Sequence, residues 1–413
     1  MSKKILILAE TLDVDSSSAG KACNAFIKSL AAEDFYIIAY HYSHKEININ
    51  SVQTILIKEN RKDIYYFLSR SQRVFQRLTK NDISKKMENR FGFSFTFKND
   101  VNGMVKAMEH ENPSDYDLII TLSKGASYRT HAALLKLPKW HNKWLAYIHD
   151  PYPFHWYPPP YEWTEAGCVK KEWFFVQIAH KSKWLGYPSQ RLAEWMGQFD
   201  NAFLKKAVVL PHQMPRNKTE NSTPLPSFYL KDKFTVLHAG NLLKQRNPFP
   251  LIAAWKRFLE EIPEAKKCSQ LLLIGPSSYH QPKLSAIHNT IPSIFVSEGN
   301  MNYEEVLQME TEVTVNIVLE AVSEISPFLP AKFPGLVKAN RPIFHLGPVN
   351  SESRRLLGID YEYVAAADDV IAIKGTLKSC FVNWKSNDFQ LNRGDLNEYF
   401  SSSYLKKIVD SLV

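Results

Sequence analysis

Several features are scarce or missing in this sequence, and each absence narrows what the chain can do. No apolar run approaches the roughly 20 residues that a helix needs to cross a bilayer. The cysteines are far apart and form no Cys-x-x-Cys or Cys/His cluster, so we expect a reduced, cytoplasmic protein without structural zinc. They are Cys23, Cys168, Cys268 and Cys380. The dispersed lysines and arginines contain no known nucleic-acid-binding motif, which makes nucleic acid the least favoured anionic partner.

The first ten residues, MSKKILILAE, have a basic dipeptide and a short apolar run. A signal peptide begins in the same way, but this run stops at Glu10 and no small-residue cleavage site follows. The segment therefore predicts a first buried strand.

The chain does have length and positive charge. With 413 residues it is too long for one ordinary core, so we expect two domains of roughly 200 residues each. Hydrophobic residues make up 45% and charged residues 23%, a balance typical of globular proteins. The net charge of +9 favours an anionic partner, either a phosphorylated substrate or an anionic membrane surface.

The first half alternates short apolar runs with longer amphipathic stretches. A charged, aromatic stretch at 61–112 predicts a helical insertion, and 172–199 predicts a further helix. The apolar runs predict buried parallel strands. They lie at 5–9, 35–40, 54–57, 117–121, 144–149 and 207–210.

Residues 214–231 have the Pro, Asn, Ser and Thr content of a linker, and the alternation restarts after them. We predict strands at 234–240, 271–275, 293–296, 313–319 and 342–346, with helices between them. Such alternation predicts an α/β fold with two Rossmann-like parallel-sheet domains facing across a cleft. We place an acceptor-side domain at 1–215, a nucleotide-sugar-binding domain at 216–395 and a C-terminal helix at 396–413 that returns to the first domain.

The segment HAGNLLKQRNP (238–248) is the most informative loop. A buried strand ends at Gly240, where a missing side chain lets the backbone approach a ligand. Lys244 and Arg246 follow, just before a helix that begins near Pro248. Cations beside a helix N-terminus can hold a diphosphate, although the same pattern also fits a solvated basic turn.

From this segment onward the chain resembles the retaining glycosyltransferases of GT-B fold, especially family 4 and its bacterial polysaccharide-assembly relatives. The family's diphosphate-binding Arg and Lys would fall near Asn241 and Arg246, with Lys244 as a further source of charge. The strand LLLIG matches the family's strand that ends in glycine, here Gly275. In SEGNMNYEEV, the resemblance implies that Gly299, Asn300 and Met301 hold the nucleotide base through the backbone.

The stretch SPFLPAKFPGLVKANRPIFHLGP (326–348) is similar to the family's Lys-x-x-Glu-Tyr segment beside the sugar nucleotide. Ser326 opens it, and Lys332 aligns with its lysine. The glutamate that holds the ribose aligns with Gly335, so ribose recognition must differ here. Glu320 and Glu324 lie upstream and could substitute, or act only as exposed loop charges.

In the first domain, the segment WLAYIHDPYP places His149 and Asp150 at the end of a predicted strand. The resemblance places a histidine here near the transferred sugar, whereas a lone histidine is as often structural. In the loop after strand 117–121, Lys124 and Arg129 could meet an anionic acceptor or merely be solvated. The aromatic, proline-rich stretch 151–163 could stack on a sugar or meet lipid, although a buried loop is slightly favoured.

The resemblance implies transfer of a hexosyl group from a UDP- or GDP-linked sugar to a glycan or lipid-linked glycan, with retention and without metal. It assigns Arg246, Lys332 and His149 to catalysis, and it requires no cofactor besides the nucleotide sugar. Peripheral contact with the inner membrane face fits the charge. Two alternatives remain: a sugar-nucleotide isomerase of the same fold, and a non-catalytic sugar-nucleotide or glycan-binding protein.

Overall fold

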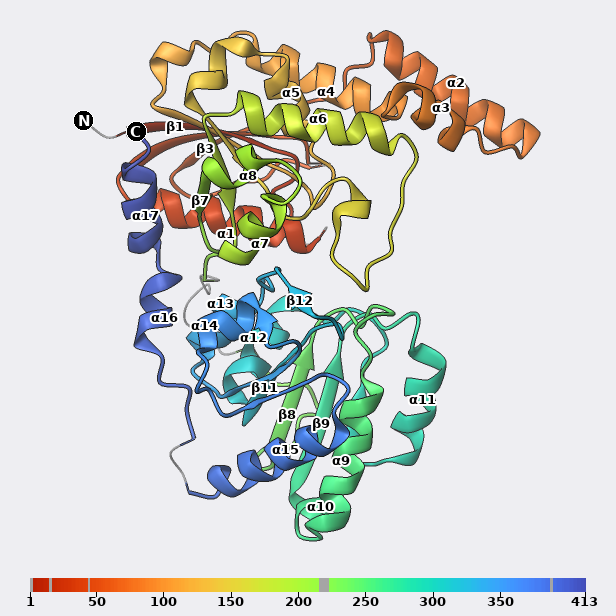
Figure 1. Ribbon diagram of the computed structural model, residues 1–413, viewed down its shortest axis with the longest axis vertical. Helices are drawn as coiled ribbons and strands as arrows, with labels where there is room; N and C mark the ends of the chain where they lie inside the picture. The colour runs from red at the N-terminus through yellow and green to blue at the C-terminus, as the bar shows by residue number, and fades with distance from the viewer. Residues whose placement is uncertain (1–2, 15–16, 44, 215–222, 387–388) are drawn as a thin grey trace. The chain divides into compact units, whose positions relative to one another are not determined.

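The computed structural model describes residues 3–14, 17–43, 45–214, 223–386 and 389–413, and it shows an α/β protein with two parallel sheets (Figure 1). The chain divides into two units. Unit 1 comprises residues 1–157, 161–213 and 399–413, and unit 2 comprises 158–160 and 214–398.

Unit 1 is built on a seven-stranded parallel sheet with the order β3-β2-β1-β4-β5-β6-β7. Its apolar runs become strands because both faces of the sheet are covered: alternate residues of β1 point to opposite sides. Ile5 and Ile7 pack toward α1 and α17, while Leu6 and Leu8 pack toward α4, α5 and α6. The strands are β1 (Lys3–Ala9), β2 (Phe35–His41), β3 (Val52–Leu56), β4 (Leu118–Leu122), β5 (Trp144–Tyr147), β6 (Trp184–Tyr187) and β7 (Ala207–Val209).

The helices of unit 1 connect these strands, and the C-terminal helix α17 returns to pack beside α1. An ion pair of 3.2 Å between Lys3 Nζ and Asp410 Oδ1 joins the two ends of the chain. The α-helices are α1 (Ser18–Ala31), α2 (Ile64–Thr79), α3 (Ser84–Phe91), α4 (Phe95–Met108), α5 (Arg129–Leu135), α6 (Cys168–Lys181), α7 (Gln190–Met196), α8 (Asn201–Lys205) and α17 (Ser402–Asp410).

Unit 2 is built on a six-stranded parallel sheet with the order β10-β9-β8-β11-β13-β15. One face packs on α9 and α15 through a cluster that includes Phe234, Trp255 and Phe381. The strands are β8 (Phe234–Ala239), β9 (Ser269–Ile274), β10 (Ile294–Val296), β11 (Val315–Leu319), β13 (Ile343–Leu346) and β15 (Val364–Ala365), with a separate short pair β12 (Ile325–Ser326) and β14 (Asn350–Ser351).

The helices of unit 2 follow its strands, as right-handed parallel connections require. Helices α9 and α15 lie side by side on one face of the sheet (Figure 1). The helices are α9 (Phe249–Glu261), α10 (Ala265–Cys268), α11 (Gln281–Thr290), α12 (Tyr303–Glu312), α13 (Phe333–Ala339), α14 (Glu352–Leu357), α15 (Val370–Trp384) and α16 (Gly394–Tyr399).

The predicted parallel strands and the helical insertion at 61–112 are confirmed, but the continuous helix at 172–199 is wrong. Helix α6 ends at Lys181, and β6 then runs between β5 and β7. Gly186 makes this close pairing possible: a Cβ there would lie 2.9 Å from Tyr147 Cδ2 and 3.1 Å from Leu210 Cδ1. A four-residue strand containing a glycine carries too little pattern to be separated from the flanking helices.

In the described part of the chain, every helix is too short or too polar to cross a membrane.

Candidate functional site

The carboxyl edge of the unit 2 sheet brings three predicted glycines together. Gly240 follows β8, Gly275 follows β9 and Gly299 lies in the loop after β10. Gly275 and Gly299 form an antiparallel bridge, and Ser297 Oγ accepts a hydrogen bond of 2.8 Å from Gly275 N. The same hydroxyl donates to Gly299 O at 2.9 Å. The backbone is therefore fixed at these three glycines, and their missing side chains would let a phosphate or nucleotide approach it.

Of these three glycines, Gly275 is the least able to accept a side chain. Its φ is +124°, and a Cβ would lie 2.4 Å from Gly240 O. We expect Gly275→Ala to lower the free energy of unfolding by about 2 kcal/mol or more, since it combines backbone strain with a main-chain clash. Thermal and denaturant unfolding measure this.

The matched control is Gly375→Ala within α15, where a Cβ would meet nothing within 4 Å. Since alanine favours a helix over glycine, that variant should be stabilised by about 0.5–1 kcal/mol. Equal stability of the two variants would show that the backbone around Gly275 can move to accept a side chain.

Lys332 reaches this edge from the residue before α13. Its ammonium group donates to Ala239 O at 3.0 Å and to Ile317 O at 2.8 Å, so it bridges the ends of β8 and β11. Burial, the largest effect, and the Arg246 charge lower the pKa of Lys332 to about 8, while the Glu310 carboxylate acts in the opposite direction. Lys332 forms no ion pair in the described part of the chain.

His238 and Arg246 complete the group. A Cβ on Gly240 would lie 3.5 Å from His238 Nε2 and 3.9 Å from Lys332 Nζ, which places both side chains at this glycine. Both ring nitrogens of the buried His238 lack a hydrogen bond with good geometry, as does the buried Nε of Arg246. Burial and the charges of Lys332 and Arg246 hold the pKa of His238 well below its usual range.

We refer to the cations Lys332 and Arg246, together with the neutral ring of His238 beside them, as the cation cluster. Buried polar groups are normally paired, whereas His238 has only a poorly aligned contact with the Ile317 backbone and Arg246 Nε has no bond, so both need an explanation beside the Lys332 ammonium. An anionic oxygen ligand at Gly240 would supply acceptors for these groups and offset their mutual repulsion. The chemistry of the cluster therefore suits phosphate.

The other predicted donor-site residues surround the cluster without joining it. Asn241 and Asn300 are exposed, and Met301 packs against the cluster of apolar side chains around Leu237. Lys244 is also exposed, and its ammonium lies 5.7 Å from the centre of the Tyr279 ring. In the loop 238–248, Arg246 therefore lies near Lys332 and Lys244 does not.

The position of the missing ribose glutamate, Gly335, is buried within α13. Glu324 is exposed, but Glu320 is not the exposed loop charge that the sequence suggested. Glu320 Oε1 accepts from Ser353 Oγ at 2.6 Å and from His345 Nε2 at 3.2 Å. Ser326, predicted at the donor site, is buried and also bonds to this carboxylate.

Burial raises the pKa of Glu320, but bonds from His345, Ser326 and Ser353 outweigh it and leave the pKa below its usual value. Glu320 Oε1 therefore ties together the loops after β11 and β13, while the buried Oε2 has no hydrogen bond with good geometry.

In unit 1, His149 lies just after β5, at the carboxyl edge of that sheet. Its ring packs 4.5 Å from Tyr147 and is stacked on His212 at 6.3 Å, and its Nε2 lies 3.8 Å from Cys23 Sγ. Burial, His212 and His131 hold the pKa of His149 well below its usual value, so the ring is neutral. A neutral imidazole can accept or donate a hydrogen bond to a sugar hydroxyl.

Two sequence alternatives in unit 1 are decided by side-chain contacts. Arg129 is paired with Glu10 at 2.7 Å and with Asp100 at 3.0 Å, so it is a structural cation. In the aromatic stretch, Tyr152 and Trp156 are buried, and Trp156 is stacked on Phe199 at 4.3 Å.

Two Asp-x-Asp triplets occur, at 13–15 and 115–117. Asp13 pairs with Lys45 at 3.2 Å, and Asp15 lies outside the described residues. Asp117 precedes β4 at the amino edge of the sheet, where it accepts from Lys4 N at 2.8 Å. No group of three or more potential ligands that could hold a metal occurs among the described residues.

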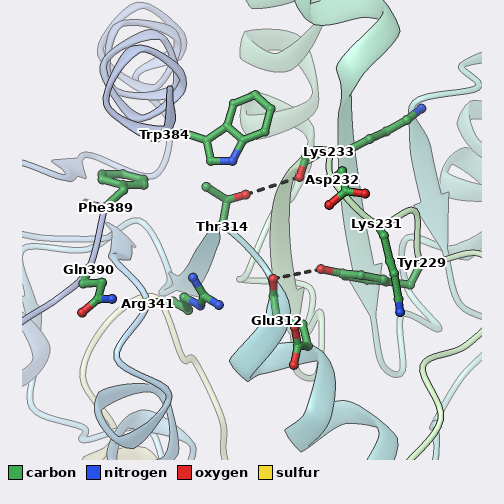
Figure 2. A pocket seen from close by; sticks show the side chains of 10 residues that line it. All are labelled: Tyr229, Lys231, Asp232, Lys233, Glu312, Thr314, Arg341, Trp384, Phe389 and Gln390. Atoms are coloured by element: carbon green, nitrogen blue, oxygen red, sulfur yellow. Dashed lines mark hydrogen bonds between the residues drawn. The ribbon is translucent and has the colours of Figure 1, made fainter. Parts of the chain in front are cut away.

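A cavity of about 380 Å³ lies elsewhere in unit 2 (Figure 2). Lys233, Thr314 and Arg341 in its wall immediately precede β8, β11 and the β13 segment, so it lies at the amino edge of the sheet. Arg341 Nε is already bonded to Thr311 O at 2.8 Å, and Tyr229 Oη to Glu312 O at 2.9 Å. This cavity contains none of the predicted site residues.

His238 is the member of the cation cluster that sequence reasoning missed. The available signal was a histidine in a buried strand, two residues before the glycine that ends it. A buried polar side chain needs a hydrogen-bond partner, and for His238 the nearest place where a ligand could supply one is the end of the strand.

No protein-family model matches this chain, and no curated protein matches its sequence. Solved structures are similar in fold. The HepE protein of Anabaena in complex with UDP and glucose gives a TM-score of 0.62 at 11% identity, over 99% of both chains. The α,α-trehalose 6-phosphate synthase of Burkholderia multivorans also gives 0.62 at 11% identity, over 99% of this chain and 98% of that one. A glycosyltransferase from Rickettsia africae gives 0.57 at 11% identity, over 100% and 95%.

The chain therefore has the GT-B fold of these glycosyltransferases, as the sequence predicted. The likeness extends to that fold and not to family 4 in particular.

Proposed function

We propose that this chain is a glycosyltransferase that moves a hexosyl group from a UDP- or GDP-linked sugar to a hydroxyl of a glycan or lipid-linked glycan. The cation cluster of unit 2 carries the proposal. It offers a buried ammonium, a guanidinium and an imidazole to an anionic ligand at a glycine-rich strand end. The similarity to a protein that binds UDP and glucose gives further support.

The reaction breaks the bond between the sugar's anomeric carbon and the diphosphate oxygen. The electron pair stays on that oxygen, and the acceptor hydroxyl oxygen forms the new bond to the anomeric carbon. The acceptor's proton passes to the leaving diphosphate, as the proposed retaining mechanism requires. Arg246 and Lys332 stabilise the negative charge that grows on the diphosphate, more in the transition state than in the ground state.

Three finer points belong to the same proposal. Fixed cations neutralise the diphosphate, so the reaction proceeds without metal. His149 bonds to the transferred sugar or positions the acceptor. The protein acts on the cytoplasmic side of a membrane that carries the acceptor.

The first test is a thermal-shift screen with UDP, GDP, ADP, CMP and their common sugars, without metal. A ligand at about 100 times its dissociation constant should stabilise the fold by about 2.7 kcal/mol. We expect a shift with one nucleoside diphosphate and its sugars, and no shift with the other bases. Failure of every nucleotide to shift the midpoint would overturn the donor site.

Analysis of the reaction products distinguishes a transferase from an isomerase and from a non-catalytic binding protein. A transferase releases the free nucleoside diphosphate, slowly by hydrolysis and faster when an acceptor is added. An isomerase would convert one sugar nucleotide into another without acceptor. A non-catalytic binder, which the glycine at position 335 would suit, would give the thermal shift and neither product.

A further inference from the structure

Helix α2 is amphipathic, but it is oriented in the opposite way to an ordinary surface helix. Its polar side faces the protein: Ser69 is buried, and Gln72 Nε2 donates to Ser84 Oγ at 3.1 Å. Gln76 Nε2 donates to Asp82 Oδ1 at 2.6 Å. In Figure 1, α2 and α3 extend to one side of unit 1, beyond α4.

The opposite side of α2 is apolar and exposed to solvent. At 100° per residue, its apolar side chains fall within an arc of about 120°. Leu78 is 78% exposed, Ile64 66% and Phe67 58%. We call this set the apolar face of α2, and it consists of Ile64, Phe67, Leu68, Val74, Phe75 and Leu78.

A surface helix normally turns such a face toward the core, where each buried Phe or Leu contributes about 1.5–3 kcal/mol. Here that gain is not realised within the chain. The helix is nevertheless well formed, since the Asp63 carboxylate caps it by accepting from Tyr65 N at 2.8 Å. An apolar face held outward on a stable helix marks an interaction surface.

Charge identifies the partner. Arg70 and Arg77 are exposed and follow one border of the apolar face, whereas Arg73 lies on the polar side and donates to Ser69 O at 3.2 Å. Residues 61–90 hold nine basic and three acidic residues, a net charge of +6 out of the chain's +9. An exposed apolar stripe bordered by arginines matches the boundary between lipid tails and anionic headgroups.

We propose that α2 lies in the plane of an anionic lipid bilayer, with its apolar face among the acyl chains and its arginines at the phosphates. Its 16 residues are too short and too polar to cross the bilayer, so the contact is peripheral and reversible. This deepens the proposed function, because it names the surface where a lipid-linked acceptor would be met. Its test needs no nucleotide sugar, so either proposal can fail without the other.

The test is co-sedimentation of the full chain with phosphatidylcholine vesicles that contain either no anionic lipid or about 30 mol% phosphatidylglycerol. We expect binding to the anionic vesicles, weakened by added salt because the arginines are exposed. Phe67→Glu and Phe75→Glu should each weaken binding at least tenfold, the equivalent of about 1.4 kcal/mol for one apolar side chain. Arg70→Gln combined with Arg77→Gln should remove the preference for anionic lipid.

Ile371→Glu is the matched control, because Ile371 is 69% exposed on α15 of unit 2 and should not affect binding. All of these side chains are exposed, so the unfolding midpoints should stay close to that of the unmodified protein. Two results would overturn the proposal: wild-type protein that ignores anionic vesicles, or Phe67→Glu protein that binds them normally. A lipid-free dimer that Phe67→Glu dissociates would assign the apolar face to a second copy of the chain instead.

Discussion

Replacing Lys332 with methionine is expected to lower turnover by about 100- to 1000-fold, the usual cost of removing one group that stabilises transition-state charge. Methionine keeps most of the aliphatic stem but removes the ammonium that bonds to Ala239 O and Ile317 O. Loss of those bonds is destabilising, whereas removal of a buried cation is favourable, so we expect little net change in stability without ligand. The stabilisation by nucleoside diphosphate should largely disappear.

Arg246→Gln is a second variant, and it is unlike Lys332→Met because Arg246 Nε has no partner to lose. It should reduce turnover and nucleotide affinity while the folded protein stays intact. Lys338→Ala is the control: this lysine is exposed on the same helix as Lys332 and should retain full activity. Full activity in both Lys332→Met and Arg246→Gln would exclude the cation cluster as the diphosphate site.

The same prediction has a pH signature. The pKa of Lys332 is lowered to about 8 without ligand, and a bound diphosphate would raise it. Nucleotide affinity should therefore fall above pH 8, by up to about tenfold per pH unit, as the lysine loses its proton. In Lys332→Met protein this decline should vanish, a change that a purely structural role would not produce.

The sequence was sufficient to predict the edge of the sheet on which the cluster lies, but not which groups meet there. Parallel strands end at a common edge, so residues after β8 and before α13 were expected to be near each other. That reasoning could not rank Lys244 against Arg246. One residue, Gln245, separates them in the chain, yet it is the Arg246 charge that acts on Lys332, while Lys244 lies over the Tyr279 ring.

For helix α2, too, the sequence predicted the element but not its orientation. The charged, aromatic character of residues 61–112 predicted a helical insertion, and α2 lies within it. An apolar stripe gives the period of a helix but not the side that faces the protein. In the structure Ser69 is buried and Phe67 is exposed, so the polar side of α2 faces the protein and the apolar side faces solvent. The Glu320 network was hidden for a related reason, since Ser353 and His345 lie far from Glu320 in the chain.

The second large effect expected is loss of stability in mild acid, caused by neutral histidines buried in unit 1. Burial lowers the pKa of His131 to about 3 and that of His212 to about 4. His131 Nε2 donates to Tyr147 O at 3.1 Å, and its Nδ1 lies 3.1 Å from Thr130 Oγ1. His149 is lowered in the same direction.

The sign follows from proton binding in the two states. An unfolded histidine takes up its proton near pH 6.5, whereas these folded ones stay neutral until much lower pH. The unfolded chain therefore binds more protons below pH 6.5, and the free energy of unfolding falls as the pH falls. His131 and His212 together give a slope that approaches, at most, about 2.7 kcal/mol per pH unit near pH 5.

Urea midpoints measured from pH 8 to 4.5 test this slope. Stability should be flat above pH 7 and fall steeply below pH 6.5, until the loss approaches the lower end of the roughly 5–15 kcal/mol that stabilises a typical domain. His212→Gln should reduce the slope by about half, because only one of the two best-defined groups remains. His110→Gln, at an exposed position, should leave the curve unchanged. A flat profile between pH 7 and 5 would contradict this prediction, because it would mean that the buried rings take up protons in the folded protein at the same pH as in the unfolded chain.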